Sequence, residues 1–135
     1  MLISRETDYS IRILRSLGSG EKFTADELCK KELLPKQFAY KILKRLQKAG
    51  IVVILSGAEG GFRLNVDLQK MSVYDLVEVM QAGRLIGSCM DGEFECDWRK
   101  REGKCKVHNH LGIIQKKWDD ELKGISLHQL IFEDI

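Results

Sequence analysis

The chain has 135 residues, which is enough for one domain with its own core and a helical appendage. Hydrophobic residues make up 44% and charged residues 31%, which excludes an intrinsically disordered chain. The longest apolar run, Ile51 to Leu55, is too short to cross a membrane, and the first residues lack the pattern of a secretory signal. We therefore expect a cytoplasmic protein whose four cysteines are buried thiols, ligands or redox groups rather than disulfides.

The net charge of +2 is spread unevenly. Between Lys30 and Gly50 seven basic residues stand against one acid, so this window carries +6 and the rest of the chain −4. Such a basic stripe is typical of a protein that binds the phosphate backbone of a nucleic acid, although a solvated helix face has the same composition.

Three helices are predicted in the first fifty residues. Apolar spacing and closing glycines predict a helix over residues 7–17. A capping box, Thr24 to Glu27, starts a short helix over 25–31, and Pro35 suits the first turn of a third helix that ends at Ala49-Gly50.

The third helix has two opposite faces. Its apolar stripe consists of Phe38, Ile42, Leu43 and Leu46. Its polar face consists of Lys36, Gln37, Tyr40, Lys41, Lys44 and Lys48. A basic helix that follows a short helix by a tight connection is typical of a helix-turn-helix, whose second helix enters the major groove. We expect Gln37 and Tyr40 to read bases and Lys36, Lys41 and Lys44 to neutralise phosphates.

A β-hairpin is predicted directly after this helix. The run Ile51 to Leu55 is β-branched, residues 56–61 form a glycine-rich turn, and Phe62-Arg63-Leu64 alternates as a return strand. At this position the hairpin is interpreted as a DNA-contacting wing with Ser56 and Gly57 at its tip; the alternative is a hairpin without that role.

The rest of the chain divides into three parts. A fourth helix, capped by Ser72 and Asp75, is expected to end at Gly83. Residues 84–105 are expected to be irregular, and a long helix follows whose apolar seam contains Val107, Leu111, Ile114, Trp118 and Leu122. A second capping box at Ser126 to Gln129 starts a short final helix. We interpret the seam as the interface of a homodimer, with packing against the chain's own domain as the alternative.

These elements predict a mainly α fold with a small β-hairpin wing: a winged helix-turn-helix followed by a long C-terminal dimerisation helix. The expected division is a DNA-binding domain over residues 1–83, a cysteine-bearing loop over 84–105, and the dimerisation helix with a short terminal helix over 106–135.

Cys89, Cys96 and Cys105 are separated by six and eight intervening residues, in a charged, glycine-containing segment that offers little core. Thiolates there favour a soft or borderline metal, either zinc or the iron of an iron–sulfur cluster; free redox thiols and buried thiols are the alternatives. His108 is the one histidine with a ligand-like neighbour, Cys105, whereas Cys29 lies in the second helix and is interpreted as a structural thiol.

The sequence resembles the Rrf2 family of bacterial winged-helix transcription regulators, whose iron–sulfur-sensing members include IscR and NsrR. The resemblance is strongest at residues 46–52 and 60–64, and it includes the opening at residues 7–12, the helix at 72–77 and the position of the cysteines.

The resemblance implies a homodimer that binds a palindromic promoter operator, with Cys89, Cys96 and Cys105 as ligands of a [2Fe–2S] or [4Fe–4S] cluster. It implies two candidates for a fourth, non-thiolate ligand: Asp8, given by the partner subunit in NsrR-like proteins, and His108, as in IscR-like proteins. The protein would then be a redox-, nitric-oxide- or iron-sensing regulator, such as a repressor.

The sequence also departs from its relatives. Ser56 and Glu59 replace basic wing residues, and Tyr40 replaces an acidic base-contacting residue. The sequence shows no enzyme motif and predicts neither a membrane partner nor a small-molecule substrate. The alternative to a cluster-controlled regulator is a zinc-stabilised or cluster-free winged-helix regulator or interaction module.

Overall fold

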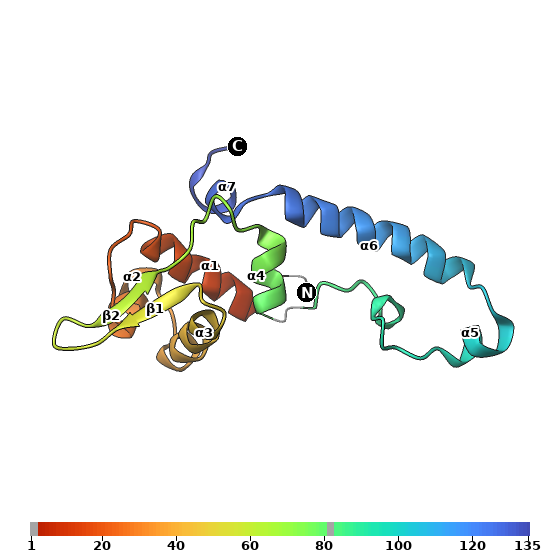
Figure 1. Ribbon diagram of the computed structural model, residues 1–135, viewed down its shortest axis with the longest axis horizontal. Helices are drawn as coiled ribbons and strands as arrows, with labels where there is room; N and C mark the ends of the chain where they lie inside the picture. The colour runs from red at the N-terminus through yellow and green to blue at the C-terminus, as the bar shows by residue number, and fades with distance from the viewer. Residues whose placement is uncertain (1–2, 81–82) are drawn as a thin grey trace.

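The computed structural model describes residues 3–80 and 83–135. Its helices and strands follow the predicted order (Figure 1). In chain order they are α1 (Arg5–Leu17), α2 (Ala25–Glu32), α3 (Lys36–Lys48), β1 (Val52–Leu55), β2 (Gly61–Leu64), α4 (Val73–Val79), the 3₁₀ turn η1 (Ser88–Met90), α5 (Asp97–Glu102), α6 (Lys106–Gly124) and α7 (Leu127–Phe132). The prediction of a mainly helical, winged fold with a long helix near the C-terminus is confirmed.

Local capping residues set the beginnings of the first helices. The hydroxyl of Ser4 accepts a hydrogen bond from the backbone N–H of Thr7, so α1 begins two residues before its predicted start. The capping box between Thr24 and Glu27 is confirmed at the start of α2. Pro35 is the residue before α3, where its fixed φ of −65° directs the chain into the helix.

The hairpin after α3 is antiparallel. Val52 pairs with Leu64 and Leu55 pairs with Gly61, and an isolated bridge from Phe23 to Phe62 joins the outer edge of β2 to the α1–α2 connection. Gly61 has a φ of +155°, and a Cβ there would lie 2.8 Å from the carbonyl oxygen of Phe23. The close approach of these two backbones therefore requires glycine.

One core holds α1, α2, α3, the hairpin and α4 together. The four residues predicted for the buried face of the fourth helix, Val73, Leu76, Val77 and Met80, are all buried. That helix ends at Val79 rather than at the predicted Gly83; Met80 is its C-cap, and residues 81 and 82 lie outside the described residues.

The final helix contributes to the same core, which the sequence analysis did not predict. Its capping box at Ser126 and Gln129 is confirmed. Leu127 is fully buried among the core residues, and the backbone of Ser72 pairs with that of Ser126. The proposed division at residues 83 and 105 remains a prediction, because no observation tests it.

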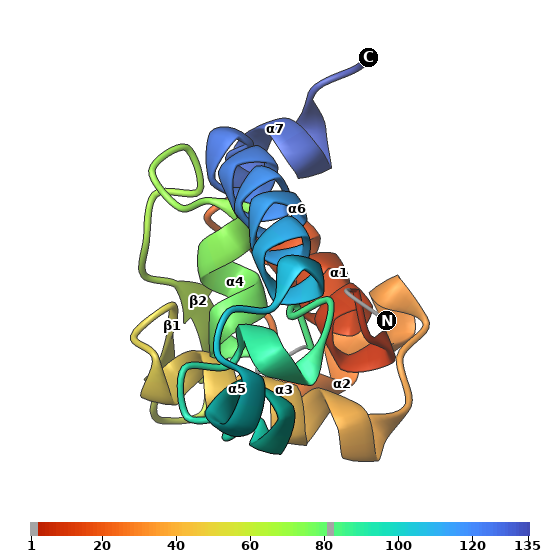
Figure 2. The same ribbon diagram turned by 90° about the vertical axis from the view of Figure 1, so that its right-hand side faces the viewer.

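The cysteine-bearing segment extends away from this core and returns through α6 (Figures 1 and 2). The prediction that it is irregular is wrong at two places, because Ser88–Met90 form a 3₁₀ turn and Asp97–Glu102 form α5. Arg99, Lys100 and Arg101 lie in the last turn of α5, where positive charge suits the helix dipole.

Candidate nucleic-acid interface and metal centre

The side of α3 opposite the core is fully open. Ile42, Leu43 and Leu46 are at most 1% exposed, whereas every residue of the predicted polar face is exposed. Those residues are Lys36, Gln37, Tyr40, Lys41, Lys44 and Lys48. The turn before the helix passes through Leu33, in the left-handed region at φ 56°, and Leu34, which is buried. This anchoring fixes which face of α3 points outward.

Two of the four lysines on this face are held by carboxylates. Lys36 Nζ lies 3.1 Å from Asp26 of α2, and this hydrogen bond raises the pKa of Lys36. Lys41 Nζ lies 2.7 Å from Glu6 of α1, and its hydrogen bond lowers the pKa of Glu6.

The remaining polar groups of the face are unengaged. Among the described residues, Lys44 and Lys48 make no ion pair, and the side chains of Gln37 and Tyr40 make no hydrogen bond with protein groups. The Tyr40 side chain is 54% exposed. These groups are free to meet a ligand without first breaking an internal contact.

The hairpin tip lies beside a cation that the sequence analysis missed. Ser56 and Gly57 are exposed at the tip, as predicted for residues that could contact DNA. Lys22, from the α1–α2 connection, pairs with the carboxylate of Glu59 at 3.9 Å and donates a hydrogen bond to its carbonyl oxygen. Arg63 is exposed on β2, opposite Val53. Lys22 therefore offsets the charge of Glu59, and Arg63 gives the wing an exposed cation although its turn lacks a basic residue. The alternation of residues 62–64 could have revealed Arg63, but nothing local could have revealed Lys22.

The predicted metal ligands are only partly brought together. Cys89 lies in η1, and Cys96 and Cys105 are the residues just before α5 and α6; all three are free, half-buried thiols. Cys105 Sγ accepts a hydrogen bond from the backbone N–H of His108 at 3.4 Å. Within residues 3–80 and 83–135 no three Cys, His, Asp or Glu side chains come close enough to hold a metal ion.

The other candidate ligand, Asp8, lies on α1, where it pairs with Arg12 at 3.0 Å. Cys29 packs beside the core, and burial together with Asp26 raises the pKa of its thiol. That environment suits the predicted structural role for Cys29.

The chemistry of the donor set fits an iron–sulfur cluster or zinc. Three thiols and an imidazole lie on one segment, and such donors bind these metals. His108 Nδ1 is the one buried side-chain nitrogen or oxygen in the described part of the chain that has no hydrogen-bond partner. Since buried polar atoms normally have partners, this nitrogen is suited to a ligand.

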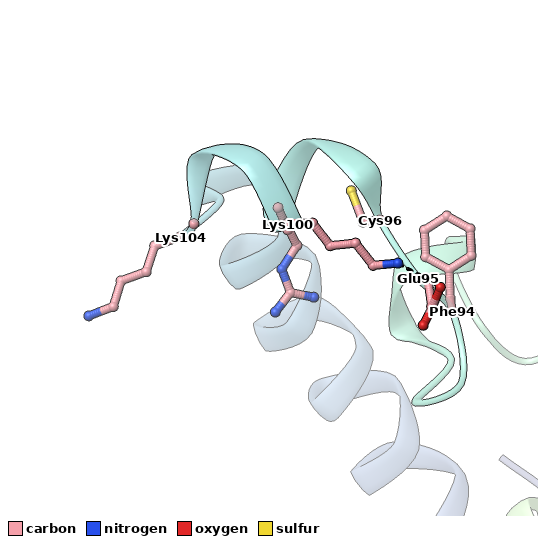
Figure 3. A pocket seen from close by; sticks show the side chains of 7 residues that line it. Phe94, Glu95, Cys96, Lys100 and Lys104 are labelled. Atoms are coloured by element: carbon pink, nitrogen blue, oxygen red, sulfur yellow. Dashed lines mark hydrogen bonds and ion pairs between the residues drawn. The ribbon is translucent and has the colours of Figure 1, made fainter.

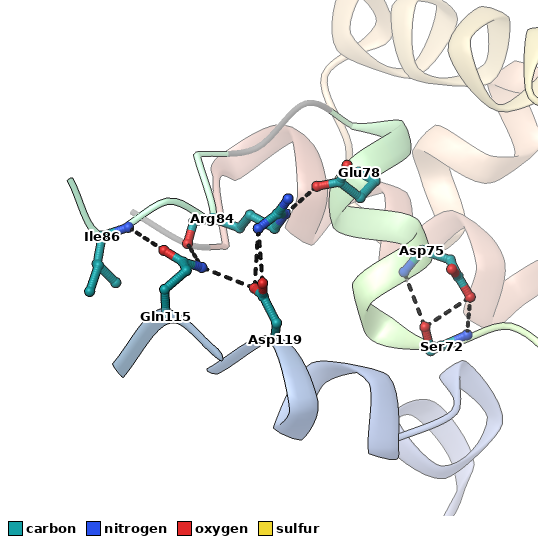
Figure 4. A network of polar contacts seen from close by, with 7 residues as sticks. All are labelled: Ser72, Asp75, Glu78, Arg84, Ile86, Gln115 and Asp119. Atoms are coloured by element: carbon teal, nitrogen blue, oxygen red, sulfur yellow. Dashed lines mark hydrogen bonds and ion pairs between the residues drawn. The ribbon is translucent and has the colours of Figure 1, made fainter. Parts of the chain in front are cut away.

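A polar network ties the start of the cysteine-bearing segment to α4 and α6 (Figure 4). Arg84 pairs with Glu78 of α4 and lies 3.2 Å from Asp119 of α6. Gln115, 7% exposed, accepts a hydrogen bond from the backbone N–H of Ile86 and donates to the carbonyl oxygen of Arg84 and to Asp119. The segment therefore leaves the core from a fixed point.

Three residues of the α6 seam are exposed. Val107, Ile114 and Trp118 are 66%, 45% and 46% exposed. Leu111 and Leu122 of the same seam are half-buried, and Leu122 packs against the core. The described residues include no helix with the length and hydropathy needed to cross a bilayer.

A helix-turn-helix with an outward cationic helix and an adjoining hairpin defines a winged-helix DNA-binding protein. A family model described as "Iron-dependent Transcriptional regulator" matches residues 3–133, and the chain belongs to this family, Rrf2. It is accordingly a transcriptional regulator and not an enzyme.

The chain is also similar to individual proteins. The chain is 29% identical over 134 residues to protein aau3 of Rhizobium meliloti, covering 97% of this chain and 85% of that protein. Its fold is similar to CymR, the global cysteine regulator of B. subtilis, with a TM-score of 0.71, 20% identity and 98% coverage of both chains. It is also similar to IscR of T. potens, with a TM-score of 0.68, 18% identity and coverage of 95% of this chain and 84% of that chain.

Proposed function

We propose that the chain is an operator-binding regulator whose affinity for DNA is controlled by a metal centre on its cysteine-bearing segment. The observation that carries the DNA-binding part is the outward face of α3, on which six polar residues are exposed while the opposite stripe is buried. Gln37 and Tyr40 lie at the N-terminal end of the helix, where base edges are read, and Lys36, Lys41 and Lys44 line the path of the phosphates. Ser56 and Gly57 would contact the backbone from the wing.

The test of this interface is the salt dependence of binding to duplex DNA. Each phosphate that a lysine neutralises adds about 0.9 to the slope of log affinity against log salt. Since Lys44 makes no ion pair within the described residues, we expect Lys44→Gln to lower the slope by about that amount. Lys70→Gln, on the connection between β2 and α4, is the matched control. An unchanged slope in Lys44→Gln would exclude this face.

We propose a homodimer that forms through α6 and binds a palindromic operator. Val107, Ile114 and Trp118 form an apolar stripe that the chain's own described residues leave open, and an apolar groove of about 350 Å³ continues it past Leu122 to Ile125. A second copy would cover this stripe and supply the two-fold symmetry that a palindrome requires. Trp118→Glu is expected to give a monomer in sedimentation equilibrium, whereas Lys116→Glu on the opposite side of α6 leaves the mass unchanged. A wild-type monomer would refute the proposal.

We propose Cys89, Cys96 and Cys105 as ligands of an iron–sulfur cluster, with His108 or the partner subunit's Asp8 as the fourth ligand. When bound, the cluster would supply a centre sensitive to redox state, nitric oxide or iron supply. The support is the set of three free thiols together with the buried, unpartnered Nδ1 of His108.

The chain's own contacts would carry the signal. The segment that holds the thiols begins at the Arg84–Gln115–Asp119 network, which joins α4 of the DNA-binding part to α6 of the proposed interface. A change in the position of this segment would therefore alter the spacing of the two recognition helices in a dimer.

Anaerobic purification tests the proposed metal centre. Brown protein with iron and acid-labile sulfide, and an operator affinity that differs from that of the metal-free form, is the expected result. Colourless protein with stoichiometric zinc would support the zinc-stabilised alternative. Equal affinities of the loaded and metal-free forms would reject control by the centre.

A further inference from the structure

A second cationic patch surrounds α5, outside the proposed recognition helix. Five basic and two acidic residues stand between Asp97 and Lys106, so these ten residues carry +3 while the whole chain carries +2. The basic residues are Arg99, Lys100, Arg101, Lys104 and Lys106, and all five are exposed. The proposed metal centre uses none of them.

Three of these cations are unpaired. Lys100 lies 2.6 Å from Glu95, and Arg101 lies 2.9 Å from Glu102. Arg99, Lys104 and Lys106 make no ion pair with any residue that the structure describes. Unpaired surface cations are the groups that release counterions when they meet phosphates.

Two of the three unpaired cations border an open hollow of about 500 Å³. Arg99 and Lys104 line it together with Phe94, whose side chain is 45% exposed (Figure 3). The hollow is open to solvent rather than enclosed, and Lys104 extends away from α6 (Figure 3). Such a surface is suited to the rounded backbone of a large polyanion.

The position of α5 relative to α3 indicates which polyanion the patch would bind. In Figures 1 and 2, α5 and α3 both lie on the side of the molecule opposite α7, and Figure 1 shows α5 toward the other end of the longest axis from α3. α6, a 19-residue helix and so about 28 Å long, runs between α5 and the α7 end. A DNA duplex placed against α3 would therefore pass on the side of the molecule from which α5 projects.

We propose that the α5 patch is a second contact to the backbone of duplex DNA, which binds phosphates beyond those reached by α3 and the wing. This inference rests on the proposed function, because it requires α3 to lie against the same duplex. Arg99 and Lys104 supply charge without base readout, so the patch adds affinity and salt dependence but no sequence preference.

The experiment compares two double variants with the same change in net charge. Arg99→Gln with Lys104→Gln is expected to lower the salt slope by about 1.8, which is the contribution of two phosphate contacts. The preferred operator sequence is expected to stay unchanged. Lys70→Gln with Lys116→Gln removes two charges from other parts of the surface and is expected to leave the slope as in wild type. Equal slopes for the two double variants would overturn the proposal.

A variant that keeps both charges distinguishes an effect of charge from an effect of structure. Lys44→Gln distinguishes a failure of this inference from a failure of the proposed function. Arg99→Lys with Lys104→Arg keeps both charges and is expected to restore the wild-type slope, which a structural role would not predict. All measurements use metal-free protein of verified dimer mass, so that changes in metal content do not contribute. If Lys44→Gln lowers the slope and Arg99→Gln with Lys104→Gln does not, the α5 contact fails alone; if wild type ignores duplex DNA both in the metal-free form and with its metal bound, the proposed function fails with it.

Discussion

Glu6 is expected to restrain DNA binding by holding Lys41. Its carboxylate in the first turn of α1 lies 2.7 Å from the ammonium of Lys41, and its second oxygen lies 3.4 Å from Arg45. A phosphate that approaches α3 must share or replace this carboxylate. Replacement of Glu6 by glutamine removes the competing charge and also removes its repulsion of the DNA.

The expected change in DNA affinity depends on how exposed the Lys41–Glu6 ion pair is. The side chains of Lys41 and Glu6 are 57% and 25% exposed. Ion pairs of this kind contribute about 0.5–1 kcal/mol, which corresponds to about a two- to fivefold change in affinity. We expect Glu6→Gln to bind operator DNA tighter by this factor. We also expect its salt slope to rise by up to about 0.9, because Lys41 becomes a full phosphate partner.

The assay is fluorescence anisotropy with a labelled duplex over a series of salt concentrations. The control is Glu21→Gln, which makes the same change in net charge in the α1–α2 connection, where Glu21 is exposed and outside α3. If Glu6→Gln binds no tighter than Glu21→Gln, the ion pair with Lys41 does not oppose DNA binding and the reasoning is wrong.

Three further predictions concern stability. Burial opposes ionisation of Glu32, but hydrogen bonds from Arg15 and Ser16 outweigh it and lower its pKa. This stabilisation is full above the unfolded-state value of about 4.3 and is lost as pH falls through the lower folded value. Glu32→Gln should therefore cost about 1–3 kcal/mol in urea unfolding at pH 7 and flatten the loss of stability below pH 5. Gly60→Ala should destabilise the hairpin by about 1–3 kcal/mol in thermal melts, because the new Cβ would collide with the carbonyl oxygen of Leu55. Gln115→Ala should cost about 1–3 kcal/mol and speed hydrogen exchange at Ile86, whose N–H loses its acceptor.

Each of the three stability predictions has a possible result that would contradict it. Parallel acid unfolding curves for wild type and Glu32→Gln would show that the Glu32 carboxylate is not the group that titrates. Gly92→Ala, at a site with open space around it, is the control for Gly60→Ala, and equal melting temperatures would remove the steric argument. Lys116→Ala is the control for Gln115→Ala; unchanged protection at Ile86 would mean that another group satisfies its N–H.

The elements that were predicted correctly are those that interactions between residues close in the sequence determine. The capping boxes at Thr24, Ser72 and Ser126 each involve residues three apart, so the sequence alone contains the complete interaction. The buried and exposed faces of α3 follow in the same way from helical spacing.

The features that were missed depend on residues distant in the chain. Glu32 is buried because Arg15 and Ser16 of another helix reach it, and no pattern within α2 reveals that partner. Lys22 reaches the wing from a separate connection. The metal site remains a prediction for a related reason: the thiols are spaced along one segment, and their convergence would depend on a bound metal and on a second subunit.

The burial of Leu127 joins α7 to the core that the first eighty residues build. Its side chain enters a core built mostly from the first eighty residues, and α7 packs against α1. During synthesis Leu127 can join this core only after α7 has emerged, whereas Cys89, Cys96 and Cys105 emerge earlier and lie outside the core. Removal of α7 would therefore expose the interior of a unit that begins more than a hundred residues upstream.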